Sequence, residues 1–206
     1  MGPQKMVTLD VEGVLIPEVW VNLAARTGID ELRRTTRDEP DYDTLMTYRL
    51  EILDREGVTM GDLREVLAEM GPLDGAKEFL DGLRDHYQVI LLSDTFQQFA
   101  SPLMNQLGCP TILCHQLRIE DDRIVDYVLR IDDHKRRSVE AFQSLNYQVV
   151  AAGDSYNDLS MIRAADAGAL FHAPPNVIGE NPDLPAFDSY DDLRAWIDDT
   201  DSVPGA

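Results

Sequence analysis

Met6-Val7-Thr8-Leu9-Asp10-Val11-Glu12-Gly13 is an apolar run that ends in two acids and a glycine. Its first four residues predict a buried β-strand, with both acids at or just beyond the strand's carboxyl end. A second apolar run, residues 148–152, leads into Gly153-Asp154-Ser155-Tyr156-Asn157-Asp158 and repeats this arrangement much later in the chain. Ligands bind at the carboxyl ends of the strands in an open parallel sheet. Carboxylates gathered there favour a hard divalent cation and phosphate chemistry.

The balance of charge argues against two classes of partner. With 38 acidic against 18 basic residues, the 206-residue chain has a net charge of −20. Nucleic acids and anionic membrane surfaces are bound through basic patches, so we expect neither as a partner. The length suits one domain, or one domain with a modest insertion.

Cysteine usage and hydropathy indicate the compartment. The two cysteines, Cys109 and Cys114, lack the spacing of a zinc motif and are too few for a disulfide framework. No apolar run approaches the length of a bilayer span, and the N-terminus lacks the charged-then-apolar pattern of a secretion signal. We therefore expect a soluble cytoplasmic protein, because thiols stay reduced in that compartment.

Strand-like and helix-like segments alternate along most of the chain, which predicts an α/β fold with a Rossmann-like, doubly wound, largely parallel sheet. The predicted strands are residues 6–10, 88–93, 111–115, 148–153 and 167–171. The predicted crossover helices are residues 76–85, 96–107 and 137–145. A dinucleotide-binding role is disfavoured, since no Gly-x-Gly-x-x-Gly turn follows the first strand. Short alternating segments between residues 111 and 131 predict a β-hairpin.

A block of helices is predicted between the first two strands. Helical patterns cover residues 18–27, 30–36, 43–56 and 61–69, and glycine and proline residues interrupt them. We expect residues 17–75 to form a small helical cap, inserted into a core made of residues 1–16 and 76–206. A cap placed directly after the Asp10 loop would lie over the acidic edge as a lid.

Four motifs in order resemble those of the haloacid dehalogenase superfamily. They are Asp10-Val11-Glu12-Gly13-Val14, Ser93-Asp94-Thr95, Lys135, and Gly153-Asp154-Ser155-Tyr156-Asn157-Asp158. The helical insertion resembles the cap of the phosphoserine phosphatase branch of that superfamily. Within the branch, the chain is most similar to the bifunctional type, which also transfers the phosphoryl group from phosphoserine to homoserine.

The resemblance implies a phosphatase of serine and threonine biosynthesis that works through an aspartyl phosphate on Asp10. It implies a Mg²⁺ ion held by Asp10, Asp154 and the backbone carbonyl of Glu12, whose side chain would be the general acid and base. A carboxylate is a poor nucleophile toward a negatively charged phosphate, so it needs a cation that screens the repulsion. Lys135 would stabilise the equatorial oxygens of the transferring group.

The remaining motif residues would bind phosphate or orient other groups. By the same resemblance, Ser93 and the backbone N–H groups of Asp94 and Thr95 would bind phosphate oxygens as a nest. Asn157 and Asp158 would orient Lys135 and water on the metal. His134-Lys135-Arg136-Arg137 contains several cations, and either arginine could take the place of Lys135.

Two departures from the usual pattern favour the bifunctional type. The acid two residues after the nucleophile is commonly aspartate, and here it is Glu12, which is one methylene longer. Asp94 and Thr95 stand where the ordinary phosphoserine phosphatase has two glycines, so they add bulk and a charge near the phosphate. Both departures also occur in the bifunctional type.

Two residues of the predicted cap match side chains that bind the amino-acid part of the substrate. Glu18 matches an acid that pairs with the substrate ammonium, and Arg49 matches an arginine that pairs with the substrate carboxylate. The partners implied are therefore the small molecules phosphoserine and homoserine. A simpler reading makes Glu18 a first-turn helix acid and Arg49 a surface salt-bridge partner.

Other interpretations stay open from the sequence alone. The chain could act on another small phosphorylated metabolite. It could also be a phospho-accepting signalling module, although a helical insertion after the first strand counts against that class. The four histidines show no metal spacing and are interpreted as surface or packing residues; they are His86, His115, His134 and His172.

Overall fold

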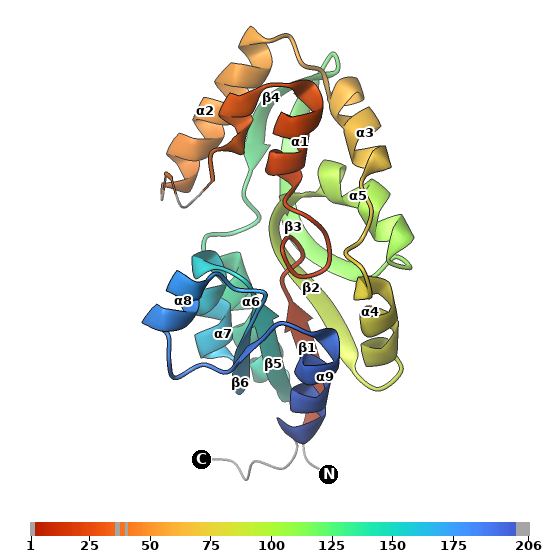
Figure 1. Ribbon diagram of the computed structural model, residues 1–206, viewed down its shortest axis with the longest axis vertical. Coiled ribbons are helices and arrows are strands. Elements are labelled where there is room, and N and C mark those ends of the chain that lie inside the picture. The colour runs from red at the N-terminus through yellow and green to blue at the C-terminus, as the bar shows by residue number, and fades with distance from the viewer. Residues whose placement is uncertain (1–2, 36–37, 40, 201–206) are drawn as a thin grey trace.

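Apolar runs form a seven-stranded sheet in the computed structural model, which describes residues 3–35, 38–39 and 41–200 (Figure 1). The strands are β1 (Gln4–Leu9), β2 (Gln88–Phe96), β3 (Thr111–Glu120), β4 (Arg123–Val128), β5 (Tyr147–Gly153), β6 (Ala167–Phe171) and β7 (Ala186–Phe187). Their order is β4-β3-β2-β1-β5-β6-β7, and only the β3–β4 pair is antiparallel within this sheet. The predicted α/β class and all five predicted strands are confirmed.

The strand order reverses at β1, which places the first motif at the centre of the sheet. Leu9, the last residue of β1, pairs with Leu91 of β2 on one side and with Ala152 of β5 on the other. The chain runs outward from β1 through β2 and β3 on one side and returns to form β5 on the other side, so a crevice opens beyond the carboxyl end of β1. Asp10 follows Leu9 directly into this crevice.

Helices cover both faces of the sheet because the side chains of β5 alternate between two apolar clusters. Val150 and Ala152 belong to one cluster, while Val149 and Ala151 belong to the other. The first cluster includes residues of α4 (Ala76–Arg84), α5 (Gln97–Gln106) and α9 (Tyr190–Asp199). The second includes residues of α6 (His134–Ser144), α7 (Leu159–Ala164) and α8 (Pro175–Glu180).

The segment between β1 and α4 is helical and lies beyond one end of the sheet (Figure 1). It contains α1 (Val19–Thr27), the 3₁₀ helix η1 (Asp30–Arg33), α2 (Tyr42–Arg55) and α3 (Met60–Glu69). Side chains set the starts of two helices: Asp41 accepts from the Thr44 N–H, and Thr59 forms a capping box with Asp62. The helix predicted over residues 30–36 is shorter than expected, and residue 36 lies outside the described part.

The β3–β4 hairpin contacts these helices. Asp122 lies at the tip of the hairpin. Its carbonyl oxygen accepts from the Met60 N–H at 2.7 Å, and its carboxylate accepts from the Gly61 N–H at 3.1 Å. Arg123 also pairs with Asp54 of α2. The division into a core and a cap of residues 17–75 stays a prediction, and the hairpin expected in the core touches the expected cap.

Two element boundaries differ from the predictions. Helix α6 begins at His134 rather than at residue 137, so Lys135 lies in its first turn. Three cations at a helix N-terminus oppose the helix dipole, but Asp133 precedes the helix and pairs with Arg136. Strand β2 continues to Phe96, and its register with β3 shifts between Leu92 and Phe96.

Among the described residues, no helix has both the length and the apolar character needed to cross a bilayer.

Candidate active site

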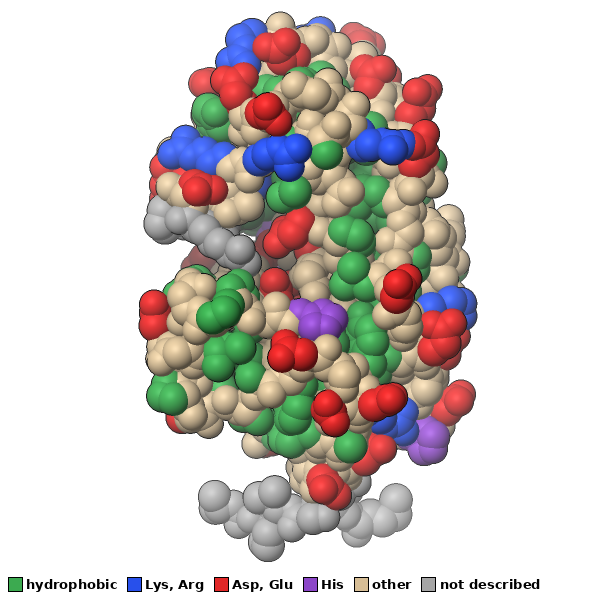
Figure 2. Space-filling model, in the orientation of Figure 1, with side chains coloured by type: hydrophobic (Ala, Val, Ile, Leu, Met, Phe, Trp, Pro, Cys, Tyr) green, Lys and Arg blue, Asp and Glu red, His purple; other side chains and the backbone are tan. Residues whose placement is uncertain are grey.

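The two acidic turns meet at the carboxyl ends of β1 and β5. The Asp10 N–H donates to the Ala152 carbonyl at 3.0 Å, which continues the β1–β5 pairing into the first turn. Carboxylate oxygens of Asp10, Asp154 and Asp158 lie within 4.8 Å of one another, and all three residues are buried. In Figure 2, the surface is hollowed between the helical segment at the top of the view and the part of the molecule below it, and acidic side chains line the hollow.

Glycines allow the backbone to approach these carboxylates closely. Gly13 has φ +78°, and a Cβ there would lie 2.4 Å from a carboxylate oxygen of Asp154. A Cβ on Gly153 would lie 2.4 Å from the Asp158 carboxyl carbon. Real Cβ atoms do not approach other atoms so closely, so both turns need glycine.

Lys135 is the cation that contacts Asp10. Its buried Nζ donates to Asp10 Oδ1 at 2.9 Å and to Asp158 Oδ1 at 2.7 Å. Burial alone would lower the pKa of Lys135, but the surrounding carboxylates outweigh it and hold the pKa well above its usual value. Arg136 instead bonds to Glu140 at 2.6 Å on the outer side of α6.

The acid cluster fits a hard divalent cation. Burial, together with Asp158 and Asp154, raises the pKa of Asp10 well above its usual value. Burial and Asp158 raise the pKa of Asp154 to about 7. Crowded carboxylates of this kind disfavour their charged forms until a cation neutralises them. An all-oxygen donor set at a strand edge is the type that Mg²⁺ prefers.

Glu12 lies in the same pocket on the side of α1. Its Oε2 accepts from the Val19 N–H at 2.9 Å, which holds the side chain against the start of that helix. Burial and the Glu18 carboxylate raise the pKa of Glu12 to about 7, against the opposing effect of hydrogen bonds from Val19 and Thr95. A carboxyl group with that pKa can both give and take a proton near neutral pH.

Arg49 is buried in the pocket wall, so it is not the surface salt-bridge residue of the simpler reading. Its guanidinium carbon lies 4.4 Å from the centre of the Trp20 ring, and Nη2 donates to the Arg34 carbonyl at 2.8 Å. Nε finds no acceptor among the described residues. Burial lowers the pKa of Arg49 to about 10. Glu18 is exposed and immediately precedes α1, and its side chain does not cap the helix.

The second motif lies in the irregular end of β2. Ser93 and Thr95 are buried, and the Thr95 N–H donates to Ser93 Oγ at 3.3 Å. The Asp94 carboxylate accepts from Asn157 Nδ2 at 2.7 Å. Asp158 Oδ2 accepts from the backbone N–H of Asp154 at 3.0 Å.

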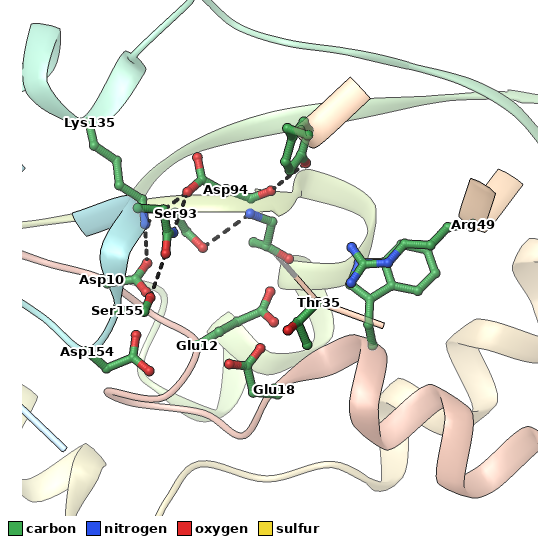
Figure 3. A pocket seen from close by; sticks show the side chains of 14 residues that line it. Asp10, Glu12, Glu18, Thr35, Arg49, Ser93, Asp94, Lys135, Asp154 and Ser155 are labelled. Atoms are coloured by element: carbon green, nitrogen blue, oxygen red, sulfur yellow. Dashed lines mark hydrogen bonds and ion pairs between the residues drawn. The ribbon is translucent and has the colours of Figure 1, made fainter. Parts of the chain in front are cut away.

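One pocket gathers all of the predicted site residues except Asp158, which lies behind it and contacts Lys135. Figure 3 shows Arg49 on one side of the pocket and Asp10, Asp154 and Lys135 on the other, with Glu12 and Glu18 between them. The sequence did not single out four further lining residues for the site: Trp20, Thr35, Tyr42 and Ser155. The Trp20 ring also packs edge-on against Phe99.

The interpretation of two histidines as surface or packing residues is incomplete. His115 and His134 are buried and their rings face the Asp94 carboxylate. They come from different elements of the fold, and no local sequence pattern joins them.

Comparisons with known proteins agree with this geometry. The family model for haloacid dehalogenase-like hydrolases matches residues 7–163. The chain is 59% identical over 187 residues to phosphoserine phosphatase ThrH of Pseudomonas aeruginosa, covering 90% of this chain and 91% of that protein. It is 56% identical to a phosphoserine phosphatase of Pseudomonas syringae pv. tomato, covering 90% of this chain and 79% of that protein.

Solved structures share the fold. A phosphoserine phosphatase solved as a phospho-aspartyl intermediate analogue matches with a TM-score of 0.79 at 18% identity, covering 94% of this chain and 99% of that one. An apo phosphoserine phosphatase matches with a TM-score of 0.75 at 19% identity, covering 91% of this chain and 94% of that one. The chain therefore belongs to the haloacid dehalogenase-like hydrolase family, in its phosphoserine phosphatase branch.

Proposed function

We propose that this protein is a Mg²⁺-dependent phosphoserine phosphatase that works through an aspartyl phosphate on Asp10. The observation that carries the proposal is a single pocket with a carboxylate bonded to a buried lysine on one side and the buried Arg49 on the other. The two relatives above, both named phosphoserine phosphatases, support the same substrate. Membership in a hydrolase family argues against the alternative that the chain is a phospho-accepting signalling module.

The pocket suits a phosphorylated amino acid because it offers a group of each sign away from the nucleophile. The Arg49 guanidinium lies over the Trp20 ring, and its Nε lacks an acceptor among the described residues, so a substrate carboxylate could satisfy it. A guanidinium binds a carboxylate through two parallel hydrogen bonds. Glu18 lines the pocket and would pair with the substrate ammonium.

In the first step, Asp10 attacks phosphorus and the bond from phosphorus to the serine oxygen breaks, while Glu12 gives that oxygen a proton. In the second step, Glu12 takes a proton from water, the water oxygen attacks phosphorus, and Asp10 is released. Lys135 stabilises the equatorial oxygens throughout. Mg²⁺, held by Asp10, Asp154 and the backbone carbonyl of Glu12, would screen the repulsion between the carboxylate and the phosphate.

The neighbouring groups have supporting roles. Ser93 and the backbone N–H groups of Asp94 and Thr95 would bind phosphate oxygens, and the Thr95 N–H would exchange its present contact with Ser93 for the phosphate. Asn157 and Asp158 would orient Lys135 and water on the metal. The helices of residues 17–75 would act as the lid. A cytoplasmic location is consistent with the two free cysteines, Cys109 and Cys114.

We also propose that homoserine can capture the phosphoryl group in place of water. Homoserine is serine with one more methylene, so the same Arg49 and Glu18 pair could hold it. Glu12 and the Asp94-Thr95 pair are the departures that the chain shares with the bifunctional type. Positioning an acceptor can be worth ~7–11 kcal/mol in favourable cases, which would let it compete with water.

The test of the main proposal measures phosphate release from phosphoserine by the purified protein, with Mg²⁺ and with a chelator. We expect release only with Mg²⁺, and a preference for phosphoserine over an aryl phosphate and over phosphate esters that lack an amino-acid group. Equal turnover of all esters would favour another small phosphorylated metabolite as the substrate. Absence of any turnover with Mg²⁺ would contradict the proposal.

Transfer is tested separately by ³¹P NMR of the protein with Mg²⁺, phosphoserine and homoserine. Phosphohomoserine is the expected product. If only free phosphate forms at saturating homoserine, the protein is a phosphoserine phosphatase without transfer activity.

A further inference from the structure

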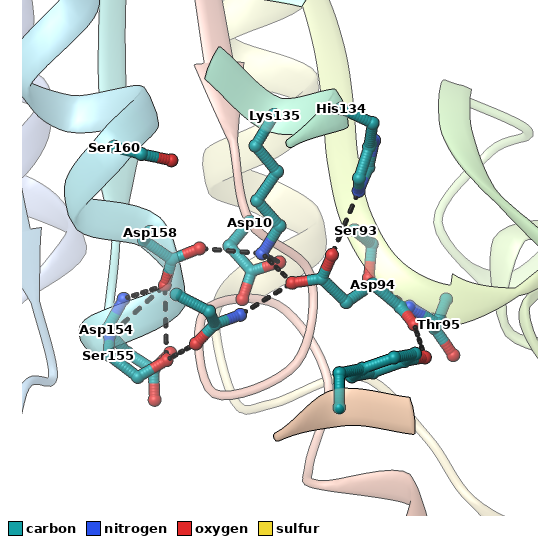
Figure 4. A network of polar contacts seen from close by, with 12 residues as sticks. Asp10, Ser93, Asp94, Thr95, His134, Lys135, Asp154, Ser155, Asp158 and Ser160 are labelled. Atoms are coloured by element: carbon teal, nitrogen blue, oxygen red, sulfur yellow. Dashed lines mark hydrogen bonds and ion pairs between the residues drawn. The ribbon is translucent and has the colours of Figure 1, made fainter. Parts of the chain in front are cut away.

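The Asp94 carboxylate lies among four donors from three separate segments of the chain, and Figure 4 shows two of them, His134 and Lys135. Its Oδ1 lies 3.0 Å from His134 Nε2 and 3.6 Å from His115 Nε2. Its Oδ2 lies 2.7 Å from Asn157 Nδ2 and 3.2 Å from Lys135 Nζ. One side chain thus joins β3, the first turn of α6 and the turn after β5.

The hydrogen bonds of the two rings identify which nitrogen carries the proton. The backbone N–H of Arg130 donates to His115 Nδ1 at 3.2 Å, so that nitrogen has a lone pair and Nε2 carries the hydrogen in the neutral ring. His134 Nε2 faces a carboxylate, while its buried Nδ1 has no partner among the described residues. A proton on that Nδ1 would be buried without an acceptor, which is costly. Both rings are therefore neutral with the hydrogen on Nε2, which donates from His134 to Asp94 at 3.0 Å and lies 3.6 Å from Asp94 in His115, beyond hydrogen-bond distance.

This assignment argues against a metal bound by Asp94 and the two histidines, although their ligand atoms lie close together. A metal would need the lone pair of His115 Nε2, and the hydrogen bond from Arg130 assigns that lone pair to Nδ1 instead. Burial would raise the pKa of the Asp94 carboxyl, but Lys135 and both histidines outweigh it and hold the pKa well below its usual value. The Asp94 carboxylate is thus charged and faces all four donors, and it contacts His134, Asn157 and Lys135 directly.

Asp94 also reaches the helical segment through its backbone. The Tyr42 hydroxyl donates to the Asp94 carbonyl at 3.1 Å, and the Tyr42 ring lies 6.3 Å from the His115 ring. On the other side, Lys135 donates to Asp10 Oδ1 at 2.9 Å. The chain of contacts therefore runs from the two histidines through Asp94 and Lys135 to the nucleophile.

We propose that Asp94 is a positioning residue for the phosphoryl-transfer site, and that neutral His134 and His115 orient its carboxylate so that it holds Lys135 and Asn157 beside Asp10. The inference rests on the proposed function for its effect on catalysis. It goes beyond the backbone role expected for Asp94, because here the side chain acts, and it gives His115 and His134 a part in the reaction.

The first test compares isosteric variants. Asp94→Asn keeps the shape, but any orientation of its amide turns an N–H toward at least one donor. Because hydrogen bonds to charged groups are involved, we expect turnover of both phosphoserine and an aryl phosphate to fall about ten- to a hundredfold. His134→Phe, which removes the donor, should lose activity similarly. His134→Gln, which restores an N–H near the Nε2 position, should recover most of it. His86→Phe, at an exposed histidine away from the site, is the matched control.

A double-mutant cycle tests whether His134 acts through Asp94. His134→Phe should have little further effect on turnover in the Asp94→Asn background. A full additional loss there, or a Gln variant as impaired as the Phe variant, would overturn the proposal. Thermal unfolding of each variant identifies any that fail to fold.

¹⁵N NMR of the histidine rings gives a readout that needs neither activity nor a variant. Both His115 and His134 should be neutral with the proton on Nε2 at pH 7. A proton on Nδ1 of either ring would overturn the inference whether or not the variants fold. If the wild-type protein released no phosphate, the proposed function would fail. The NMR result would still show whether His115 and His134 turn an Nε2–H toward Asp94.

Discussion

At the scale of single residues, burial and like charges bring two carboxyl groups with different proposed roles to similar pKa values. Glu12 and Asp154 both have a pKa of about 7, although aspartate and glutamate ordinarily titrate near 4. Asp154 is raised by burial and by Asp158 within the acid cluster, where a cation would lower it again. Glu12 is raised by burial and by Glu18, on the side toward α1. The difference in location is why we propose metal binding for Asp154 and proton transfer for Glu12.

Glu12→Gln removes the transferable proton and keeps the size of the side chain. We expect kcat to fall by roughly 10²–10⁴, the usual contribution of a positioned acid or base. Mg²⁺ affinity should change little, because the proposed ligand is the backbone carbonyl of Glu12. Steady-state kinetics and calorimetric titration with Mg²⁺ measure the two effects. A collapse of Mg²⁺ affinity with nearly normal turnover would mean that the side chain itself coordinates the metal.

Arg49→Met removes the guanidinium and keeps an apolar stem against Trp20. We expect kcat/KM for phosphoserine to fall about ten- to a hundredfold, because a bond to a charged group is lost. An aryl phosphate, which has no carboxylate, should be hydrolysed as before. Arg33→Met, at an exposed arginine of η1, is the control and should affect neither substrate. Equal losses on both substrates in the Arg49 variant would indicate a structural role.

At the scale of elements, α9 contacts the turn that carries Asp10 and Glu12. The Tyr190 hydroxyl of α9 donates to the carbonyl of Val14 at 2.6 Å, and its ring stacks on Phe79 of α4 with centres 4.8 Å apart. Val14 follows Gly13 in the turn that carries Asp10 and Glu12. Tyr190, far along the chain, therefore helps to fix the turn of Asp10 and Glu12 in place.

Tyr190→Phe should lower the free energy of unfolding by about 0.5–1.5 kcal/mol near pH 7, the usual net value of one hydrogen bond. Burial raises the pKa of Tyr190 to about 12, from an ordinary value near 10. The unfolded chain thus loses this proton first, and the stability that Tyr190 contributes falls as pH rises from 10 to 12. Urea unfolding of both proteins across this range should show their difference shrinking. A difference independent of pH would contradict the assignment.

Elements with strong local patterns were predictable, and the start of α6 was not. The five strands follow from apolar runs bounded by turns, and β4 from its short alternating pattern. The start of α6 was missed by three residues, because the cations after Asp133 suggest a loop until Asp133 is seen to pair with Arg136. The two residues are only three positions apart, so this pairing is a local signal that offsets the unfavourable cations at the helix start.

At the scale of the whole molecule, the site is a convergence of segments that the sequence keeps far apart. The convergence of Asp10, Ser93, Lys135 and Asp154 was predictable because the ordered motifs place each of them near a predicted strand end or just before a predicted helix. The contacts of His115 and His134 with Asp94 were not, because they arise from the pairing of β3 with β2 and from the packing of α6. Sequence spacing carries no signal for either.

Mg²⁺ should stabilise the entire fold if the acid cluster binds it. A ligand at one hundred times its Kd adds about 2.7 kcal/mol, and each kcal/mol raises the Tm of a chain of this size by about 2–4 °C. Thermal unfolding with and without Mg²⁺ measures this, with NaCl of equal ionic strength as the control for screening of the net charge of −20. Asp154→Asn should abolish the Mg²⁺-specific part of the shift. An equal shift in that variant would place the ion elsewhere.

The proposed function requires that Asp10 carries the phosphoryl group during turnover. Acid quenching of the protein during hydrolysis of phosphoserine, followed by peptide mass spectrometry, tests it most directly. We predict a phosphoryl group on Asp10 in the wild-type protein, and neither phosphoenzyme nor appreciable turnover in Asp10→Asn, whose side chain has the same shape without the nucleophilic charge. A phosphoryl group on another residue, or near-normal hydrolysis by Asp10→Asn, would contradict the account.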